Sequence, residues 1–330
     1  MRLTDYFDLS HRNSFGFSSR ARYGAEVTRV EEISEIACFA ERLNLPLYIL
    51  GGGSNCLLPE RLQGVVAVMA IKGWSVDDSA QDHIKVTAQA GEDWPSLVAQ
   101  ITACGIGGLE NLAGIPGTVG AAPIQNIGAY GVELSDVFER LEAYDRKENR
   151  MVTLTKADCR FAYRHSVFKE QPGRYIVSEV TLRLPRPWAP VLSYAGLRDL
   201  PTPQTPETVM QAVLAQRAAK LPDWRVLGNV GSFFHNPVVS EEIWRALPEM
   251  PGHPTDGGVK LSAGWLIDHA GLKGLRIGDA GVHEGHALVI VNHGHATLPQ
   301  VQALADQVIR RVRAKFGVTL VPEPITLGSS

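Results

Sequence analysis

The chain has 330 residues, 45% of them hydrophobic, so it can bury a large core and we expect two or three domains rather than one. Its net charge of -3 provides no polycationic surface, which argues against nucleic acid as a partner. The first residues contain no apolar export segment, and no later run approaches the ~20 apolar residues of a membrane helix, so we expect a cytoplasmic protein without membrane insertion.

The four cysteines lie far apart and form no C-x-x-C pair. This pattern indicates reduced thiols in a cytosolic protein rather than a disulfide framework. We expect structural burial to be the role of Cys38, Cys56, Cys104 and Cys159.

The N-terminal part predicts helices and strands in alternation. Thr28 and Glu31 form a predicted capping box, and the apolar residues that follow share one face, so we expect a helix over residues 28–43. The elements predicted next are a strand at 46–50, a glycine turn at 51–55, a strand at 65–71 that closes a βαβ-like unit, a strand at 84–90 and a helix at 94–104 that stops at Gly105.

A glycine-rich loop runs from Gly114 to Gly131 with five glycines, two prolines and no charged residue. Glycine places no Cβ in the way, so such a loop can bring its N–H groups against an anion. We therefore predict a cradle for a phosphate-bearing cofactor, to which the turn at 51–55 also contributes. An ordinary Gly/Pro surface loop is the alternative.

Beyond Glu133 the pattern changes to hairpins and then to a proline-rich linker, where we place a domain boundary. The C-terminal helices and strand predict a smaller α+β domain. The predicted elements are strands at 138–144, 151–155 and 176–184, a helix at 205–220, a strand at 286–292 and a helix at 299–316 capped by Gly317.

Several sequence blocks occur in a specific order along the chain. They are NSFG at 13–16, LGGGSN at 50–55, GLENLAGIPGTVG at 108–120, IQNIGAYG at 124–131, CRFAYRHSVFK at 159–169, SYAGL at 193–197, KLPD at 220–223, GNVGSFFHNP at 228–237 and AGWLIDHAGLKG at 263–274. Together they resemble the UDP-N-acetylenolpyruvoylglucosamine reductase family, which makes UDP-N-acetylmuramate for peptidoglycan. The resemblance covers residues 13 to 325, and Tyr194 marks the type I branch of the family.

The resemblance implies an α+β fold: a two-lobed FAD-binding domain of the vanillyl-alcohol-oxidase (PCMH) type, then a smaller C-terminal α+β domain that binds substrate. We expect lobe 1 at 1–72, lobe 2 at 73–200 and the substrate domain at 201–330, with the last residues packing back on the FAD domain. NADPH would reduce a non-covalently bound FAD, leave, and be replaced by UDP-N-acetylglucosamine enolpyruvate. We expect a monomer.

Reduction of an enolpyruvyl ether requires a hydride at the methylene carbon, a proton at the neighbouring carbon, and groups that hold the negative charge formed between the two events. The resemblance assigns Arg164 to the substrate carboxylate, Ser232 to proton donation and Glu323, in protonated form, to the enediolate. Pro324 follows Glu323 where valine is commoner in the family, which constrains the backbone at that point.

The remaining expected contacts fall into two sets. The predicted FAD-binding residues are Gly51, Gly52, Gly53, Ser54, Asn55, Pro116, Gly117, Thr118, Gly120, Ala121, Gln125, Asn126, Gly128, Ala129 and Tyr130. The predicted substrate-binding residues are Tyr194, Lys220, Asn236 and His286, the last standing where the family often has glutamine.

Three alternatives stand beside this interpretation. An oxidase of the same flavin fold would act on a sugar or alcohol, often with FAD tethered to histidine, and neither glycine segment contains a histidine. A non-catalytic flavin or nucleotide-sugar binding protein would not need Arg164, Ser232 and Glu323 together. A metal site at the histidines between His283 and His295 is disfavoured, because their spacing does not converge on a tetrahedron.

Overall fold

A computed structural model describes residues 1–247, 249–255 and 257–328. The chain divides into two compact units. The first contains Met1–Phe7, Ala21–Gly52 and Gln63–Ala219, and the second contains Asp8–Arg20, Gly53–Leu62 and Lys220–Ser330. Both expected FAD-binding lobes fall mainly within the first unit, and the boundaries expected at residues 72 and 200 stay a prediction.

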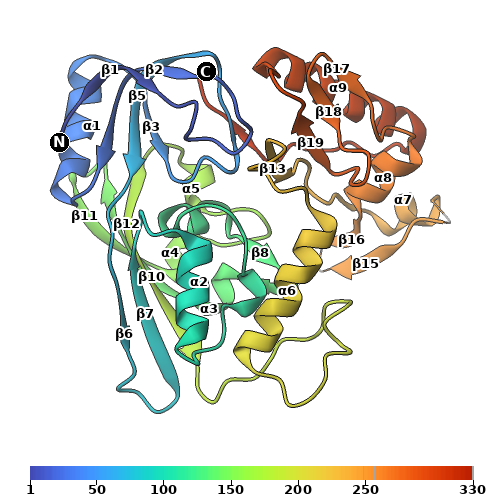
Figure 1. The fold of residues 1–330 in the computed structure, drawn as a ribbon, viewed down its shortest axis with the longest axis horizontal. Coiled ribbons are helices and arrows are strands. Elements are labelled where there is room, and N and C mark those ends of the chain that lie inside the picture. The colour runs from blue at the N-terminus through green and yellow to red at the C-terminus, as the bar shows by residue number, and fades with distance from the viewer. Residues whose placement is uncertain (248, 256, 329–330) are drawn as a thin grey trace. The chain divides into compact units, whose positions relative to one another are not determined.

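The first unit begins with a four-stranded sheet covered by helix α1 (Glu31–Arg42), at the blue end of Figure 1. The strands lie in the order β1 (Thr4–Asp8), β2 (Arg20–Val27), β5 (Arg61–Met69) and β3 (Leu47–Leu50). β3 and β5 are parallel, as a βαβ-like unit predicts. The apolar face of α1, with Ile33, Ile36 and Ala40, is fully buried against Val65 and Ala67.

The start of α1 differs from the predicted capping box. The carboxylate of Glu32, not Glu31, accepts hydrogen bonds from the Thr28 N–H at 2.8 Å and from the Arg29 N–H at 3.2 Å. The predicted partner Glu31 is exposed, because the helix begins at Glu31 rather than at the residue after Thr28. The carboxylate that reaches back is therefore one residue further along the chain.

The larger sheet of the first unit is antiparallel and carries helix α2 (Trp94–Ala103) on one face (Figure 1). Val86 and Ala88 of the sheet share a core with Trp94, Leu97 and Ile101 of α2. The strand order is β11 (Arg150–Thr155), β10 (Phe138–Asp145), β12 (Tyr175–Pro185), β7 (His83–Gln89) and β6 (Trp74–Asp77). The helices that follow are α3 (Leu134–Val137), α4 (Lys156–Cys159), α5 (Val167–Glu170) and α6 (Pro206–Lys220).

The glycine-rich segment is more regular than a loop. It follows the 3-10 helix η1 (Glu110–Leu112) and contains a second one, η2 (Val119–Gln125), before the short strands β8 (Gly128–Ala129) and β9 (Val132–Glu133). Pro123 lies inside η2, where its fixed φ suits a tight turn. Prolines and glycines in this segment thus build short helical turns rather than an irregular surface loop.

The second unit is built on small sheets. The largest is antiparallel, in the order β13 (Asn229–Ser232), β19 (Val289–Asn292), β18 (Ala280–Val282) and β17 (Arg276–Ile277), and helix α9 (Leu298–Phe316) buries Val301, Leu304 and Val308. The other elements are β4 (Cys56–Leu57), β14 (Val238–Val239), α7 (Glu241–Arg245), β15 (Gly252–Thr255), β16 (Gly258–Leu261), α8 (Ala263–His269) and β20 (Ile325–Thr326).

The predicted helix ends agree with the structure where glycine caps them. Helix α9 ends before Gly317, whose φ is +71°, and α2 ends before Gly105, whose φ is +75°. The strand predicted over 286–292 is wrong in its first half, because the Val289 N–H donates to the His286 carbonyl and closes a turn there. None of the helices in the described ranges is both long and apolar enough to traverse a bilayer.

Candidate active site

The glycine turn after β3 packs without any room for side chains. A Cβ on Gly52 would lie 2.9 Å from the Cα of Gly117, so the turn and the glycine-rich segment meet backbone to backbone within the first unit. A Cβ on Gly51 would overlap the Thr118 hydroxyl. Gly53, in the second unit, has a φ of +61° and would overlap the carbonyl of Arg12. These glycines are required by close approach and not only by turn geometry.

Thr118 presents a polar atom that no described residue satisfies. Its Oγ1 is buried and has no hydrogen-bond partner among the residues of the structure. An unpaired buried hydroxyl costs about 1 to 3 kcal/mol unless a ligand or water satisfies it. Beside it, a Cβ on Gly120 would lie 2.5 Å from the Cβ of Ala90. The site therefore combines compact backbone with one unsatisfied hydroxyl.

Asn126 holds the glycine-rich segment in place through its side chain. It has a φ of +48°, is fully buried, and donates through Nδ2 to Glu133 Oε2 at 2.7 Å and to the Ala162 carbonyl at 3.2 Å. Its Oδ1 accepts from the Ser135 N–H at 2.9 Å. These bonds tie the segment to the turn that carries Arg164.

Arg164 lies in a turn between α4 and α5. Its φ is +54°, an uncommon conformation for a non-glycine residue, and the neighbouring residues Ala162 and His165 form an isolated bridge. The guanidinium donates to the Gly128 carbonyl at 2.8 Å and lies 5.3 Å from the centre of the Tyr163 ring. The structure thus places the predicted carboxylate-binding arginine against the predicted cofactor loop.

Tyr194 packs against the same segment. Its ring centre lies 4.9 Å from that of Tyr130 in an edge-to-face arrangement, and 40% of Tyr194 is exposed. Tyr130 has a φ of +50° and is buried, and this burial raises the pKa of its hydroxyl. A predicted cofactor residue and a predicted substrate residue are therefore direct neighbours in the first unit.

Arg217 is a residue that the sequence reasoning missed. A Cβ on Gly114 would lie 3.2 Å from its Nε, so the guanidinium stands directly beside the glycine-rich segment. Burial lowers the pKa of Arg217, while the nearby Tyr130 acts in the opposite direction, and no carboxylate of the described chain forms an ion pair with it. A half-buried guanidinium with no ion-pair partner among the described residues indicates an anionic ligand.

The signal for Arg217 was present in the spacing of α6. Val209 and Val213 are fully buried, and Arg217 follows Val213 by four residues on the same face of the helix. A cation that continues an apolar face is a candidate ligand-binding residue, because solvent does not screen it there.

Ser232 ends β13 beside a backbone irregularity. The register between β13 and β19 shifts between Asn229 and Ser232, as in a β-bulge, and Gly231 has a φ of +72° with open space where a Cβ would lie. Bulges change the direction of a side chain at the end of a strand, and they are common next to active sites. The half-buried Ser232 is thus presented by a special backbone geometry rather than by a regular strand.

Glu323 lies on the segment paired with the residues that follow Ser232. Its N–H donates to the Phe233 carbonyl at 2.9 Å, and Phe234 and Pro322 form an antiparallel bridge. The second unit therefore brings Ser232 and Glu323 together from positions 91 residues apart in the sequence. Arg164 belongs to the first unit.

Pro324 causes no loss of the hydrogen bonds on either side of it. The N–H of Glu323 bonds to Phe233, and the N–H of Ile325 donates to the Asn55 carbonyl at 3.1 Å. Immediately afterwards, β20 pairs in parallel with β4. Proline therefore occupies a position in this segment where its missing donor breaks neither bond.

The other predicted substrate residues are distributed through the second unit. Lys220 is exposed at the end of α6, and Asn236 accepts from the Ala263 N–H at 2.9 Å, at the start of α8. His286 lies in the turn before β19, with its ring centre 5.4 Å from that of His283. Burial first, and then the charges of His283 and Lys273, lower the pKa of His286.

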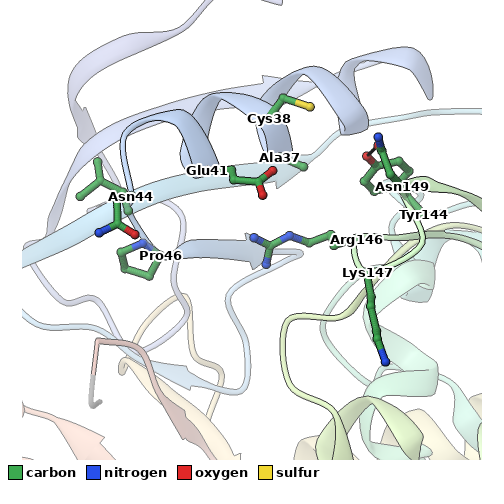
Figure 2. Close-up of a pocket in the computed structure, with 10 residues that line it drawn as sticks. Ala37, Cys38, Glu41, Asn44, Pro46, Tyr144, Arg146, Lys147 and Asn149 are labelled. Carbon is green, nitrogen blue, oxygen red and sulfur yellow. Dashed lines mark hydrogen bonds between the residues drawn. The ribbon is translucent and has the colours of Figure 1, made fainter.

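A separate hollow of about 680 Å³ lies in the first unit between α1 and the turn that joins β10 to β11, as Figure 2 shows. The residues that line it include Cys38, Glu41 and Arg146. Tyr144 lines it too, and its hydroxyl donates a hydrogen bond to Asn149, another lining residue. None of the predicted site residues lines it.

Cys38 and Cys104 are exposed, so the burial predicted for the cysteines holds only for Cys56 and Cys159.

Comparison with known proteins identifies both parts of the chain. Residues 22–155 match the model of an FAD binding domain, and residues 222–327 match the C-terminal domain of UDP-N-acetylenolpyruvoylglucosamine reductase. The reductase of that name from Pseudomonas aeruginosa is 45% identical over 335 residues, covering 98% of both chains. That from Cupriavidus pinatubonensis is 46% identical, again covering 98% of both.

The chain belongs to the UDP-N-acetylenolpyruvoylglucosamine reductase family. The crystal structure of this reductase from Thermus caldophilus matches the fold with a TM-score of 0.69 and 27% identity, over 99% of each chain. The predicted family, the α+β fold with its FAD-binding domain, and the assignment as an FAD-containing, NADPH-dependent oxidoreductase are thereby confirmed.

Proposed function

We propose that this chain uses NADPH and FAD to reduce UDP-N-acetylglucosamine enolpyruvate to UDP-N-acetylmuramate, through the residues described above. The observation that carries the residue-level proposal is the pairing in the second unit, where Glu323 bonds to the residue that follows Ser232. A proton donor and a carboxyl group held by one backbone ladder suit a reaction that forms and then protonates a carbanion next to a carboxylate.

We use the name glycine cradle for a group of residues in the first unit, Gly51, Gly52, Gly117, Thr118 and Arg217. These residues fit an FAD pyrophosphate. The Thr118 hydroxyl is buried without a partner, and the contacts of Gly51, Gly52 and Gly117 leave no space for side chains. N–H groups of the turn and of the glycine-rich segment would hold the phosphates, and Arg217 would supply the positive charge that the segment lacks. When bound, the flavin supplies the hydride that NADPH has delivered to it.

Arg164 would bind and orient the substrate carboxylate. Its guanidinium is anchored to the Gly128 carbonyl, and the planar fork of an arginine matches the two oxygens of a carboxylate. A fixed cation at that point stabilises the negative charge that develops as the alkene accepts a hydride. The uncommon backbone conformation of Arg164 is consistent with a functional constraint.

Ser232 would give its proton to the carbon next to the carboxylate and recover one from solvent. Glu323 would hold a proton against the carboxylate oxygen while the charge is present, and would retain it once the carbon is protonated. In the product, the hydride with its two electrons is at the former methylene carbon, and the Ser232 proton is at the carbon next to the carboxylate. A serine is a weak acid, so its position must compensate for its low acidity.

The UDP-sugar would contact Tyr194, Lys220, Asn236 and His286. A lysine and a phenol suit a diphosphate, and the exposure of Tyr194 and Lys220 leaves both accessible to a ligand. We also infer a cytoplasmic monomer, because NADPH and UDP-sugars are cytoplasmic metabolites and each proposed group is supplied by a single chain.

The decisive experiment separates the two half-reactions. The purified yellow protein is reduced with NADPH under anaerobic conditions, and the UDP-enolpyruvyl sugar is then added while the flavin absorbance is recorded. We expect the oxidised flavin spectrum to return, with one UDP-N-acetylmuramate formed per flavin. Reoxidation by oxygen but not by the sugar would contradict the proposed function.

A further inference from the structure

A histidine lies beside the proposed catalytic glutamate. His235 Nδ1 is 3.8 Å from Glu323 Oε2, and the two side chains are only 20% and 11% exposed. At this distance and burial, the charge on either group strongly affects the protonation of the other. His235 was not among the residues singled out from the sequence.

The backbone fixes this neighbourhood. The His235 N–H donates to the Val321 carbonyl at 2.9 Å, Phe234 bridges to Pro322, and the Glu323 N–H donates to Phe233. In this antiparallel register His235 faces Val321, so Glu323 is its diagonal neighbour on the same face, within reach of a long side chain. The contact therefore follows from the pairing and does not depend on a flexible loop.

We propose that His235 is a positioning residue that shares a proton with Glu323 and thereby keeps a proton at the reaction site at neutral pH. This inference rests on the proposed role of Glu323. A lone glutamate with a reference pKa of about 4.3 is ionised at neutral pH, whereas a histidine has a reference value of about 6.5. The last proton of an interacting pair belongs to the pair, and it leaves at a higher pH than the proton of an isolated carboxyl.

The proton balance of the step is simple. The pair lends its proton to the carboxylate oxygen of the substrate while the charge is present, and it recovers this proton when Ser232 protonates the carbon. No net proton leaves the pair in a turnover. Other titratable groups on elements bonded to residues 232–239 include His286, in the turn before β19, Lys260, paired with Val238, and Asp268 and His269 of α8, whose first N–H donates to Asn236. The cations among them would favour loss of the proton from the pair, so they do not account for the proton that it keeps.

The test compares His235→Gln and His235→Lys with the wild type in flavin reoxidation by the UDP-enolpyruvyl sugar across a range of pH. Glutamine keeps a polar side chain but cannot carry a proton, whereas lysine keeps its proton to high pH. We expect the alkaline decline in rate to move down by roughly two pH units in His235→Gln, the difference between the reference values of histidine and glutamate. In His235→Lys it should move above that of the wild type.

Reduction of the flavin by NADPH serves as the control at each pH and should show no such shift. The proton-sharing role would be overturned if the reoxidation rate declined at the same alkaline pH in all three proteins. A uniform loss of rate with an unchanged pH profile would also overturn it. In a Glu323→Gln background the His235 substitutions should produce no further shift, and an additive effect would also contradict the pairing. Failure of the wild type to reoxidise with the sugar would instead reject the proposed function itself.

Discussion

The glycine cradle of the first unit and the Ser232–Glu323 pairing of the second solve different physical problems. The cradle consists of uncharged backbone, a buried threonine hydroxyl and the half-buried cation of Arg217. The pairing carries groups that gain and lose protons, attached to short strands and a bulge. Tight cofactor binding needs fixed dipoles in a compact place, whereas proton transfer needs side chains whose charge can change.

This difference teaches which substitutions should affect which half-reaction. Changes in the cradle should act on cofactor retention and folding, and they should depend little on pH. Changes at the pairing should spare the bound flavin and act on the step with the sugar.

Removal of the proposed proton donor should have the largest effect. In Ser232→Ala we expect flavin reduction by NADPH to persist, while reoxidation by the UDP-enolpyruvyl sugar falls by a factor of about 10² to 10⁴, the usual contribution of a positioned acid. Stopped-flow absorbance of each half-reaction measures both. Ser240→Ala, at the cap of the exposed helix α7, is the matched control and should leave both rates unchanged. Equal losses in the two half-reactions of Ser232→Ala would show that the glycine cradle and the Ser232–Glu323 pairing do not act on separate half-reactions.

Addition of one methyl group to the turn should be the next largest effect. Gly52→Ala places a Cβ 2.9 Å from the Cα of Gly117, and we expect a loss of roughly 1 to 3 kcal/mol of unfolding free energy, together with loss of FAD. Gly264→Ala is the matched control, because the added Cβ meets only an ordinary contact there, 3.6 Å from the Leu288 Cβ. The control substitution should cost little unfolding free energy. Similar urea denaturation midpoints for the two variants would show that close approach is not the constraint.

Replacement of Arg217 should separate FAD binding from stability. In Arg217→Leu we expect FAD affinity to fall about tenfold to a hundredfold, the value of one charge-assisted bond. The flavin-free protein should be at least as stable as the wild type, because a half-buried guanidinium without an ion-pair partner is partly desolvated at a cost. Flavin titration and thermal unfolding of the apoprotein check these outcomes, with the exposed Arg310→Leu as control. Unchanged FAD affinity would exclude Arg217 from the cradle.

The smallest effect concerns a charge that takes no part in the proposed chemistry. The N–H of Thr28 first, with Arg29 and the N-terminus, lowers the pKa of Glu32 to about 2. Because the folded state favours the carboxylate, its contribution is present above the unfolded value of 4.5 and is lost as the pH falls towards 2. We expect Glu32→Gln to cost about 1 kcal/mol at neutral pH, since solvent and salt screen part of the effect, and almost nothing in strong acid.

Urea unfolding at the two pH values measures this difference. Glu35→Gln is the control on the same helix, with a side chain that is 53% exposed. The pH profile of flavin reoxidation should be the same in both variants, and a shift in Glu32→Gln would show that titration outside the second unit also affects the proposed chemistry.

The sequence predicts the elements of this fold well where periodicity and capping glycines coincide. Helices α2 and α9 follow from apolar spacing and a glycine stop, which specify the buried face and the end, and strand β12 follows from its alternating apolar residues. The start of α1 was misjudged because Glu31 and Glu32 are adjacent acids and only the helix phase decides between them. The first half of the strand predicted over 286–292 is wrong because His286 begins a turn that closes at Val289, in an apolar context.

The local sequence pattern also predicts the glycine cradle. It does not predict the positive charge of Arg217 or the distant segments that come into contact. Arg217 and His235 acquire their surroundings from contacts with distant segments, Gly114 and Glu323 respectively. The resemblance to a family supplied Arg164, Ser232 and Glu323, whose types alone would not distinguish them from surface residues. What a single sequence lacks is the tertiary pairing that buries a charge or places a bulge.

The parallel pairing of β20 with β4 has a consequence for biosynthesis. Ile325 and Thr326 lie beside Cys56 and Leu57, directly after the glycine turn, and Glu323 is fixed just before them. A ribosome makes residues 56 and 57 long before residues 325 and 326, and loop closure over such a span is slow. In the nascent chain the glycine turn is therefore made long before Glu323, whose N–H can bond to the Phe233 carbonyl only after residue 323 has been added.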